Sequence, residues 1–209
     1  MGLFSAGRSL FGGLLVGGVF SVMGGQEIKE AIGNPEPTNA TCQQLHAGPV
    51  GKEWLTVSGC VMDLRRATYF FKKDKPSEVT DLYIPVFVDD ENGPERAKLS
   101  LHTTDRELIK RYSLLKALGD KGEDLQVYFQ QHASDLIIRE TLSGMIETGM
   151  NKSSEEHNKI KEIDTDLAPD FVVLRHNKKP NLGGGITMLG LGAIFCLVGV
   201  FRGIRSVRR

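Results

Sequence analysis

Two long uncharged runs, one near each end, dominate the pattern of hydrophobic and polar positions. Ser9–Gln26 has 18 residues and Asn181–Phe201 has 21, and neither contains a charged side chain. A helix needs about 20 apolar residues to cross the hydrocarbon core of a bilayer. The second run has that length, whereas the first is slightly shorter and contains six glycines. The pattern predicts two transmembrane helices over 9–26 and 181–201.

Each run has a second interpretation. Arg8 followed by the apolar stretch Leu10–Val22 has the layout of a cleaved signal peptide. No A-x-A-like cleavage site follows it, so we expect an uncleaved anchor. The second run could be the core helix of a soluble protein. The four arginines in the eight residues after it argue against that interpretation.

Positive charges set the expected orientation. The two outer tails, residues 1–8 and 202–209, carry five basic residues: Arg8, Arg202, Arg205, Arg208 and Arg209. The inner flanks of the two runs carry four: Lys29, Arg175, Lys178 and Lys179. Loops rich in Lys and Arg stay in the cytoplasm. The dense C-terminal cluster, expected at the lipid headgroups, therefore predicts cytoplasmic termini. It places the central domain on the far side, in the periplasm of a bacterial inner membrane or across an organelle membrane.

The segment between the runs, residues 27–180, predicts one α+β domain that is mainly β. Alternating apolar residues indicate strands over 53–73, 79–88, 97–103, 124–131, 140–148 and 170–176. Gly59 and Gly144 lie in the middle of short strands, which suits a small curled barrel. We expect an OB-like, partly open barrel. A sandwich with one helix packed on a sheet is the alternative.

One amphipathic helix is expected over 104–119. Thr104 would cap it, Glu107 would complete a capping box, and Gly119 would end it in the left-handed conformation. A second capping box, T-x-x-Q starting at Thr41, predicts a short helix that ends at Gly48.

Charge is balanced overall but unevenly placed. The chain has 26 basic and 26 acidic residues, and every acidic residue lies between Glu27 and Asp170. The central domain therefore holds 26 acidic against 21 basic residues. Balanced charge gives no reason to expect nucleic-acid binding. Ordinary apolar and charged fractions exclude a disordered, collagen-like or disulfide-scaffold chain.

No linear motif for catalysis, a cofactor or a metal is present. The chain lacks a G-x-S-x-G elbow, a P-loop, H-E-x-x-H and C-x-x-C. His132, Ser134 and Asp135 are too close in sequence to form a triad, whose members come from distant segments. We expect no cofactor and no metal. If an active site is assembled from scattered strands, its first candidates are Asp63, Arg65, Arg66, His102 and Asp105.

The cysteines allow two interpretations. In an oxidising compartment Cys42 and Cys60 could form a disulfide. The alternative is two unrelated buried thiols, which are common for cysteine. Cys196 lies in the second apolar run, where we expect it to pack.

A stripe of small residues follows the first apolar run. It recurs every four residues: Ser9, Gly13, Gly17, Ser21 and Gly25. Small residues let helix backbones approach closely in a membrane. The stripe predicts either self-association or packing against the second run.

These observations favour a two-pass membrane protein whose central domain is a non-enzymatic binding or scaffolding module in a membrane complex. Its expected partners are the lipid bilayer and a membrane protein or a second copy of the chain. One alternative is a membrane-bound enzyme. Another is an accessory or sensor subunit of a transport system, although neither run contains the charged side chains that mark ion paths.

Overall fold

The chain folds into two units. The computed structural model describes residues 2–48, 50–51, 53–72, 74–90, 96–120, 125–147, 160 and 166–207. One unit is helical and consists of Met1–Pro35 and Pro180–Arg209, and the other is Glu36–Lys179. The second unit combines a large sheet with short helices. The expected α+β class, with an apolar helix at each end of the chain, is therefore confirmed.

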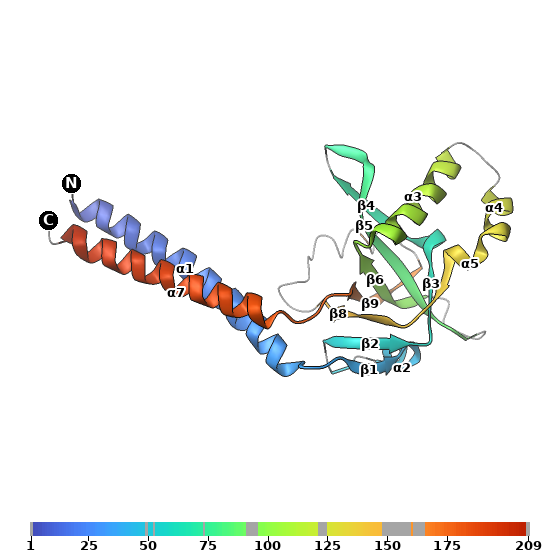
Figure 1. Ribbon diagram of the computed structural model, residues 1–209, viewed down its shortest axis with the longest axis horizontal. Helices are drawn as coiled ribbons and strands as arrows, with labels where there is room; N and C mark the ends of the chain where they lie inside the picture. Colours follow the sequence, from blue (N-terminus) through green and yellow to red (C-terminus); the bar gives the residue numbers. More distant parts are fainter. Residues whose placement is uncertain are drawn as a thin grey trace. The chain divides into compact units, whose positions relative to one another are not determined.

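The helical unit is an antiparallel pair. It consists of α1 (Gly2–Gly33) and α7 (Leu182–Val207). Gly13 near the start of α1 faces Gly199, and Gly24 near its end faces Gly185. Both chain ends therefore lie at the same end of the pair (Figure 1). Stretches of both helices are long and apolar enough to cross a membrane, with mean hydropathies of 1.2 and 2.1.

Helix α1 extends beyond the uncharged run that predicted it. It continues to Gly33, where the side-chain amide of Asn34 donates a hydrogen bond of 3.0 Å to the Glu30 carbonyl. Pro35 then follows, and the residue before a proline disfavours the helical conformation. Local capping, rather than the change from apolar to charged residues, therefore ends the helix.

The second unit is built on one mixed sheet of nine described strands. These are β1 (Thr38–Thr41), β2 (Trp54–Ser58), β3 (Cys60–Asp63), β4 (Thr68–Lys72), β5 (Lys75–Val88), β6 (Ala97–Thr103), β7 (Ile137–Arg139), β8 (Leu142–Ile146) and β9 (Leu167–His176). Their order is β1-β2-β8-β9-β6-β5-β3-β7, and β4 pairs with β5. The β1/β2 and β6/β9 pairs are parallel, and the other pairs are antiparallel.

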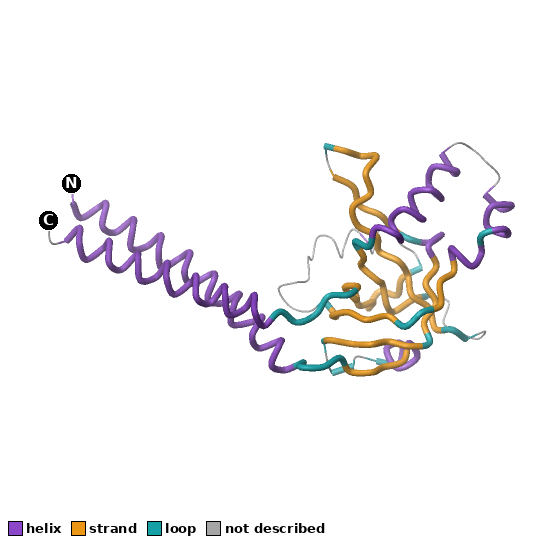
Figure 2. The backbone as a smooth tube through the Cα atoms, in the orientation of Figure 1, coloured by secondary structure: helices purple, strands orange, loops and turns teal. Residues whose placement is uncertain are grey.

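The strand pairings form a ring. Its strands are drawn in orange in Figure 2. Only Gly59 separates β2 from β3, and two residues separate β7 from β8, so each pair behaves as one bent strand. These two bent strands pair along both halves: Val57 lies opposite Leu142 and Val61 opposite Arg139. Between these two pairs the β2–β3 strand has three residues and the β7–β8 strand has two. The additional residue is accommodated at Gly59, whose φ of +68° favours glycine. From β8 the sheet continues through β9, β6 and β5 back to β3.

The main core fills the inner face of this ring. Successive strand residues point to opposite faces, so β5 sends Leu82, Ile84 and Val86 inward, where all three are fully buried. Tyr83, between them, belongs to a smaller apolar cluster with Ile160 and Phe171. Strand β5 is therefore covered on both faces.

Short helices complete the unit: α2 (Cys42–Ala47), the 3-10 turn η1 (Leu64–Arg66), α3 (Arg106–Asp120), α4 (Leu125–Gln131) and α5 (Ala133–Leu136). The capping box predicted at Thr41 is confirmed: its hydroxyl accepts from the Gln44 amide, and its own amide donates to the Gln44 side chain.

Helix α3 is confirmed with different ends. Asp105, and not Thr104, caps it, because the Asp105 carboxylate accepts from the amides of Glu107 and Leu108 at 2.9 and 3.1 Å. Gly119 lies inside the helix rather than ending it. A carboxylate one residue later in the chain outcompetes the threonine hydroxyl for the same free amides.

The strand predicted over 124–131 is wrong, because Leu125–Gln131 forms α4. The amide of His132 donates to the Tyr128 carbonyl at 2.9 Å, a helical hydrogen bond. Tyr128 and Phe129 pack against the main core, whereas Val127 is exposed. An apolar alternation this short is compatible with the period of a strand and with that of a helix. The helix is favoured because it lets the two adjacent aromatic residues both pack against the core.

Candidate functional site

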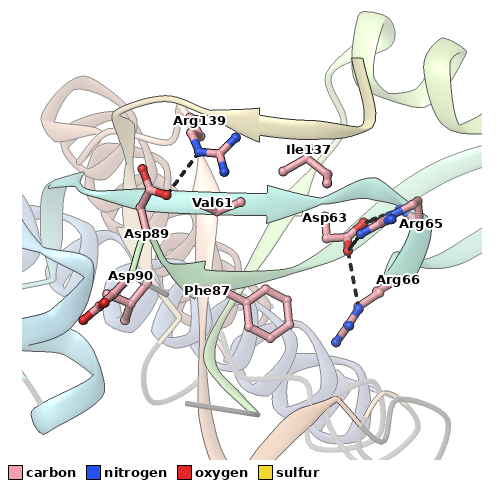
Figure 3. A pocket seen from close by; sticks show the side chains of 10 residues that line it. Val61, Asp63, Arg65, Arg66, Phe87, Asp89, Asp90, Ile137 and Arg139 are labelled. Atoms are coloured by element: carbon pink, nitrogen blue, oxygen red, sulfur yellow. Dashed lines mark hydrogen bonds and ion pairs between the residues drawn. The ribbon is translucent and has the colours of Figure 1, made fainter. Parts of the chain in front are cut away.

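The clearest candidate site is a shallow cavity of about 410 Å³ on the outer wall of the ring. We call it the Arg–Asp pocket. It is lined by Val61, Asp63, Arg65, Arg66, Phe87, Val88, Asp89, Asp90, Ile137 and Arg139. These residues come from β3, η1, the end of β5, the bend that follows it and β7 (Figure 3).

Cross-strand pairing aligns the floor of the pocket. Strand β3 lies between β5 and β7, so Val61 is opposite Phe87 on one side and Arg139 on the other. Two residues later, Asp63 is opposite Ile137. Residues two apart in a strand share a face, so Val61 and Asp63 both face the pocket. In Figure 3, Val61 lies between two separate groups of charged side chains.

Asp63 organises the first of these groups. Its side chain is only 8% exposed, and it accepts hydrogen bonds from Arg65 Nε at 2.8 Å and Nη2 at 2.6 Å. The hydrogen bond to Asp63 raises the pKa of the Arg65 guanidinium, although burial acts in the opposite direction. Arg66 Nε also lies 3.4 Å from the same carboxylate. One nearly buried acid thus holds two arginines.

Arg66 connects the charges to the apolar floor. Its guanidinium lies 5.3 Å from the centre of the Phe87 ring, a cation–π distance. It also lies 3.5 Å from the Asp166 carboxylate. With 44% of its side chain exposed, Arg66 can exchange a protein partner for a ligand.

The second charged group is a single ion pair between Arg139 Nε and Asp89, at 3.1 Å. Both side chains are substantially exposed, at 62% and 44%. Solvent screens such a pair, which contributes little to stability. Arg139 is therefore the most exposed of the three arginines that line the pocket.

The pocket combines charged and apolar lining residues. Its lining has three arginines and three aspartates around Val61, Phe87 and Ile137, so its formal charge is zero. No serine, threonine, cysteine or histidine is among the lining residues. Among the described residues no group of three or more potential ligands could hold a metal ion. The ionisable groups of the lining are therefore guanidiniums and carboxylates, beside an apolar floor.

A second polar cluster surrounds His102 on β6, away from the pocket lining. His102 Nε2 lies 3.0 Å from Asp81, and Nδ1 lies 3.6 Å from Glu147. The Tyr83 ring stacks on the imidazole at 4.4 Å. Arg175 Nε lies 2.6 Å from Glu147. When His102 is protonated, two cations face two carboxylates.

Protonation of His102 is favoured by this cluster. Burial lowers the pKa of His102, but the neighbouring Glu147 and Asp81 carboxylates outweigh it, so the pKa is raised. Burial raises the pKa of Asp81, whereas hydrogen bonds from Thr80 and His102 lower it, with a net lowering. The cluster is therefore a paired network on the sheet rather than an open site.

The five polar candidates from the sequence are dispersed. Asp63, Arg65 and Arg66 line the Arg–Asp pocket, His102 lies in the second cluster, and Asp105 caps α3. The sequence reasoning missed Asp89 and Arg139, which are 50 positions apart. Their place follows from the β3–β7 and β3–β5 pairings, which no local pattern encodes.

His132 and Asp135 form a local surface pair, with Nδ1 and Oδ2 3.4 Å apart. Ser134 between them is exposed. His132 also stacks on Tyr128, with ring centres 4.3 Å apart. The three residues lie on the exposed α5 turn and form no triad.

Cys42 and Cys60 are buried and carry free thiols in this structure. Both belong to the main core cluster. Cys196 on α7 is partly buried and lies where a Cβ on Gly17 would be.

The small-residue stripe lies only in part between the two helices. Gly13 and Gly17 meet the backbone of α7, and Ser21 meets Gly192. Gly24, rather than Gly25, continues this contact: a Cβ on Gly24 would lie 2.7 Å from the Gly185 carbonyl oxygen, whereas one on Gly25 would meet nothing within 4 Å. Ser9 lies in α1, but the environment of its side chain lies outside the described part of the structure.

In the basic tail, Arg202 and Arg205 lie exposed on the last turns of α7. Arg208 and Arg209 lie outside the described residues.

Comparison with known proteins gives no family for the chain: no family model matches the sequence, and no curated protein or solved structure is significantly similar to it.

Proposed function

We propose that the chain is an integral membrane protein that crosses the bilayer twice, and that its β-rich unit is a non-enzymatic binding module within a membrane complex. The exposure of α1 and α7 carries this proposal. Only 11% and 17% of their most apolar windows are buried. Side chains such as Phe11, Leu197 and Phe201 are more than 60% exposed. The core helices of soluble proteins bury such residues, whereas lipid accommodates them.

The contact between the helices supports an anchor rather than a cleaved signal peptide. Gly13, Gly17 and Gly24 on α1 meet backbone atoms of α7. Close backbone approach through small residues is how membrane helices associate. Cleavage after the first apolar run would remove half of this interface.

Orientation follows from the antiparallel pairing and the basic tail. An antiparallel pair that spans a membrane has both ends on one side. Arg202 and Arg205, together with the other tail arginines, favour the cytoplasm for that side. The β-rich unit then faces the periplasm of a bacterial inner membrane, or the interior of an organelle.

The ring of pairings supports an OB-like barrel. The β2–β3 strand, β5, β6, the β7–β8 strand and β9 follow one another in the chain, and α3 lies between the third and fourth. Around the ring, the third strand, β6, pairs in parallel with the fifth, β9. The fourth, β7–β8, pairs in antiparallel with the first, β2–β3. OB folds are five-stranded Greek-key barrels that act mainly as binding modules.

The Arg–Asp pocket supports binding over catalysis. Its arginines suit carboxylates and its floor suits apolar side chains. We propose that the pocket binds a segment of a membrane-protein partner that carries both carboxylates and apolar side chains. Two anchoring helices confine the module near the bilayer, which raises its effective concentration for partners in the same membrane.

Cysteine accessibility tests the orientation. In a Cys196→Ser background, we would label intact cells carrying Glu107→Cys or Ser206→Cys with a membrane-impermeant maleimide. Glu107 is exposed on α3, and Cys42 and Cys60 are buried. We expect Glu107→Cys to react in intact cells and Ser206→Cys only after permeabilisation. The reverse pattern would overturn the far-side location.

Site-specific cross-linking tests the binding role. A photoreactive residue at Arg139 or Asp90 should capture the same membrane protein, and one at Glu107 should not. The further change Arg66→Glu should weaken capture from Asp90. A product with twice the mass of the chain would identify a second copy as the partner. Equal capture from all three positions would contradict the assignment of the pocket.

A further inference from the structure

Two buried cysteines converge where the chain enters the β-rich unit. Cys42 directly follows β1, whose last residue, Thr41, lies opposite Ser58. Cys60 comes two residues after Ser58. The Cys42 thiol donates to the Phe87 carbonyl with Sγ and O 3.4 Å apart, and Cys60 is the strand partner of Val88, the next residue. The two thiols therefore lie near the same end of β5, Cys42 from the first residue of α2 and Cys60 from the first residue of β3.

Burial and electrostatics agree with this convergence. Cys42 is 0% exposed and Cys60 is 2% exposed, in the same core cluster. A hydrogen bond with the Cys42 thiol, together with burial, raises the pKa of the Cys60 thiol. Thr41 and Ser58, which precede the two cysteines by one and two positions, pair across β1 and β2. Paired strands lie about 4.8 Å apart, and disulfides join Cα atoms roughly 4.4–6.8 Å apart. The two cysteines are thus placed to be joined.

We propose that Cys42 and Cys60 form a disulfide in the native protein, which covalently fastens the β1–α2 segment to the wall of the ring. This inference rests on the proposed function, because it needs the unit to lie in an oxidising compartment. The bond forms while β1–α2 is still undocked, since both sulfurs are buried afterwards.

The chemistry is thiol–disulfide exchange with an oxidised dithiol carrier or glutathione disulfide. The thiolate of one cysteine attacks a carrier sulfur, which breaks the carrier's S–S bond and releases one carrier thiolate. The second cysteine thiolate then displaces the other carrier sulfur from the mixed disulfide. The protein loses two electrons and two protons, and the carrier gains them as two thiols.

The position of the bond explains what it contributes. Strand β1 has four residues and pairs only with β2 among the described strands, and α2 has six residues. This weak edge element leads directly from α1 into the domain. Burial keeps both sulfurs away from solvent, which suits a structural bond rather than a redox catalyst.

Peptide mapping provides the test. Full-length Cys196→Ser protein is isolated from its own membranes in excess N-ethylmaleimide and digested with trypsin without reduction. Lys52 is the only Lys or Arg between the two cysteines, so cleavage separates peptide 30–52, with Cys42, from peptide 53–65, with Cys60. We expect the two peptides to be linked, to separate on reduction, and to stay unlinked in Cys42→Ala and Cys60→Ala.

Refolding distinguishes failure of the geometry from failure of the location. The same protein, reduced and denatured, is refolded with reduced and oxidised glutathione. Closure should raise its thermal midpoint above that of the same protein kept reduced. Peptides unlinked after both isolation and refolding would overturn the geometry. Peptides unlinked after isolation but linked after refolding would overturn the oxidising location, and with it the bond as a feature of the native protein.

Discussion

Gly17 of α1 and Gly192 of α7 bring the backbones of the two long helices into direct contact. A Cβ on Gly17 would lie 2.7 Å from the Gly192 carbonyl oxygen, and one on Gly192 would lie 2.8 Å from that of Gly17. Glycines 185, 192 and 199 repeat every seven residues along α7 and all face α1. In lipid, such a contact relies on close packing because the hydrophobic effect no longer drives helices together.

Replacing Gly17 by leucine should separate the helices. The new side chain would collide with Cys196 and the α7 backbone, and overpacking typically costs about 1–3 kcal/mol. We expect a lower thermal midpoint in detergent and lower steady-state protein. Gly18→Leu is the matched control, since nothing lies within 4 Å of its Cβ position. Equal losses in both variants would show that the interface is unimportant.

Removing the Asp63 carboxylate should destabilise the domain. Asp63→Asn leaves Arg65 without a bidentate partner and Arg66 with only the Asp166 ion pair. Hydrogen bonds to charged groups contribute about 1.5–3 kcal/mol, so we expect a loss of that order by chemical denaturation of the full chain in detergent. Asp89→Asn breaks an exposed pair and should cost under about 1 kcal/mol. The reverse order would refute the central role of Asp63.

His102 should make stability depend on pH. Its pKa is raised above the ordinary 6.5 in the folded protein. Its contribution is therefore fully present below about pH 6.5 and is lost as the pH rises through the higher folded-state pKa. We expect the thermal midpoint to fall over that range, and His102→Gln to remove much of the slope. His132→Gln, which removes an imidazole from the surface, should retain it.

Gly144 should not tolerate a methyl group. A Cβ there would collide with the Arg175 carbonyl group on β9, and a clash with backbone is relieved only by moving the strand. Gly144→Ala should weaken the β8–β9 pairing and accelerate hydrogen exchange of the Glu147 and Asn177 amides, which donate to the Val173 and Ser143 carbonyls across these two strands. Gly51→Ala, with nothing within 4 Å, should behave like the wild type. Unchanged exchange in both would contradict the close approach.

Elements with a strong local signal were predictable from the sequence. The apolar helices follow from long uncharged runs, and the Thr41 capping box gives α2. Strands with one buried face follow from alternation, as in β2, where Leu55 and Val57 are buried and the residues between and beside them are not. In these segments, local propensity and tertiary burial favour the same conformation.

Other elements were decided by tertiary contacts. Leu125–Gln131 is a helix because Tyr128 and Phe129 pack on the core, against a local pattern that favoured a strand. The four residues of β1 carry no apolar alternation, and they form a strand because β2 offers an open edge.

The sequence by itself determined the plan of the chain: two apolar helices around an α+β domain, with arginines at the outer ends. Only the tertiary structure decided which residues share a surface. Arg139 joins Asp89 across 50 positions, and Cys42 approaches Cys60, through strand pairings. Hydrogen bonding between distant strands sets these neighbours, and an alternating pattern specifies which face a residue occupies but not which strand lies beside it.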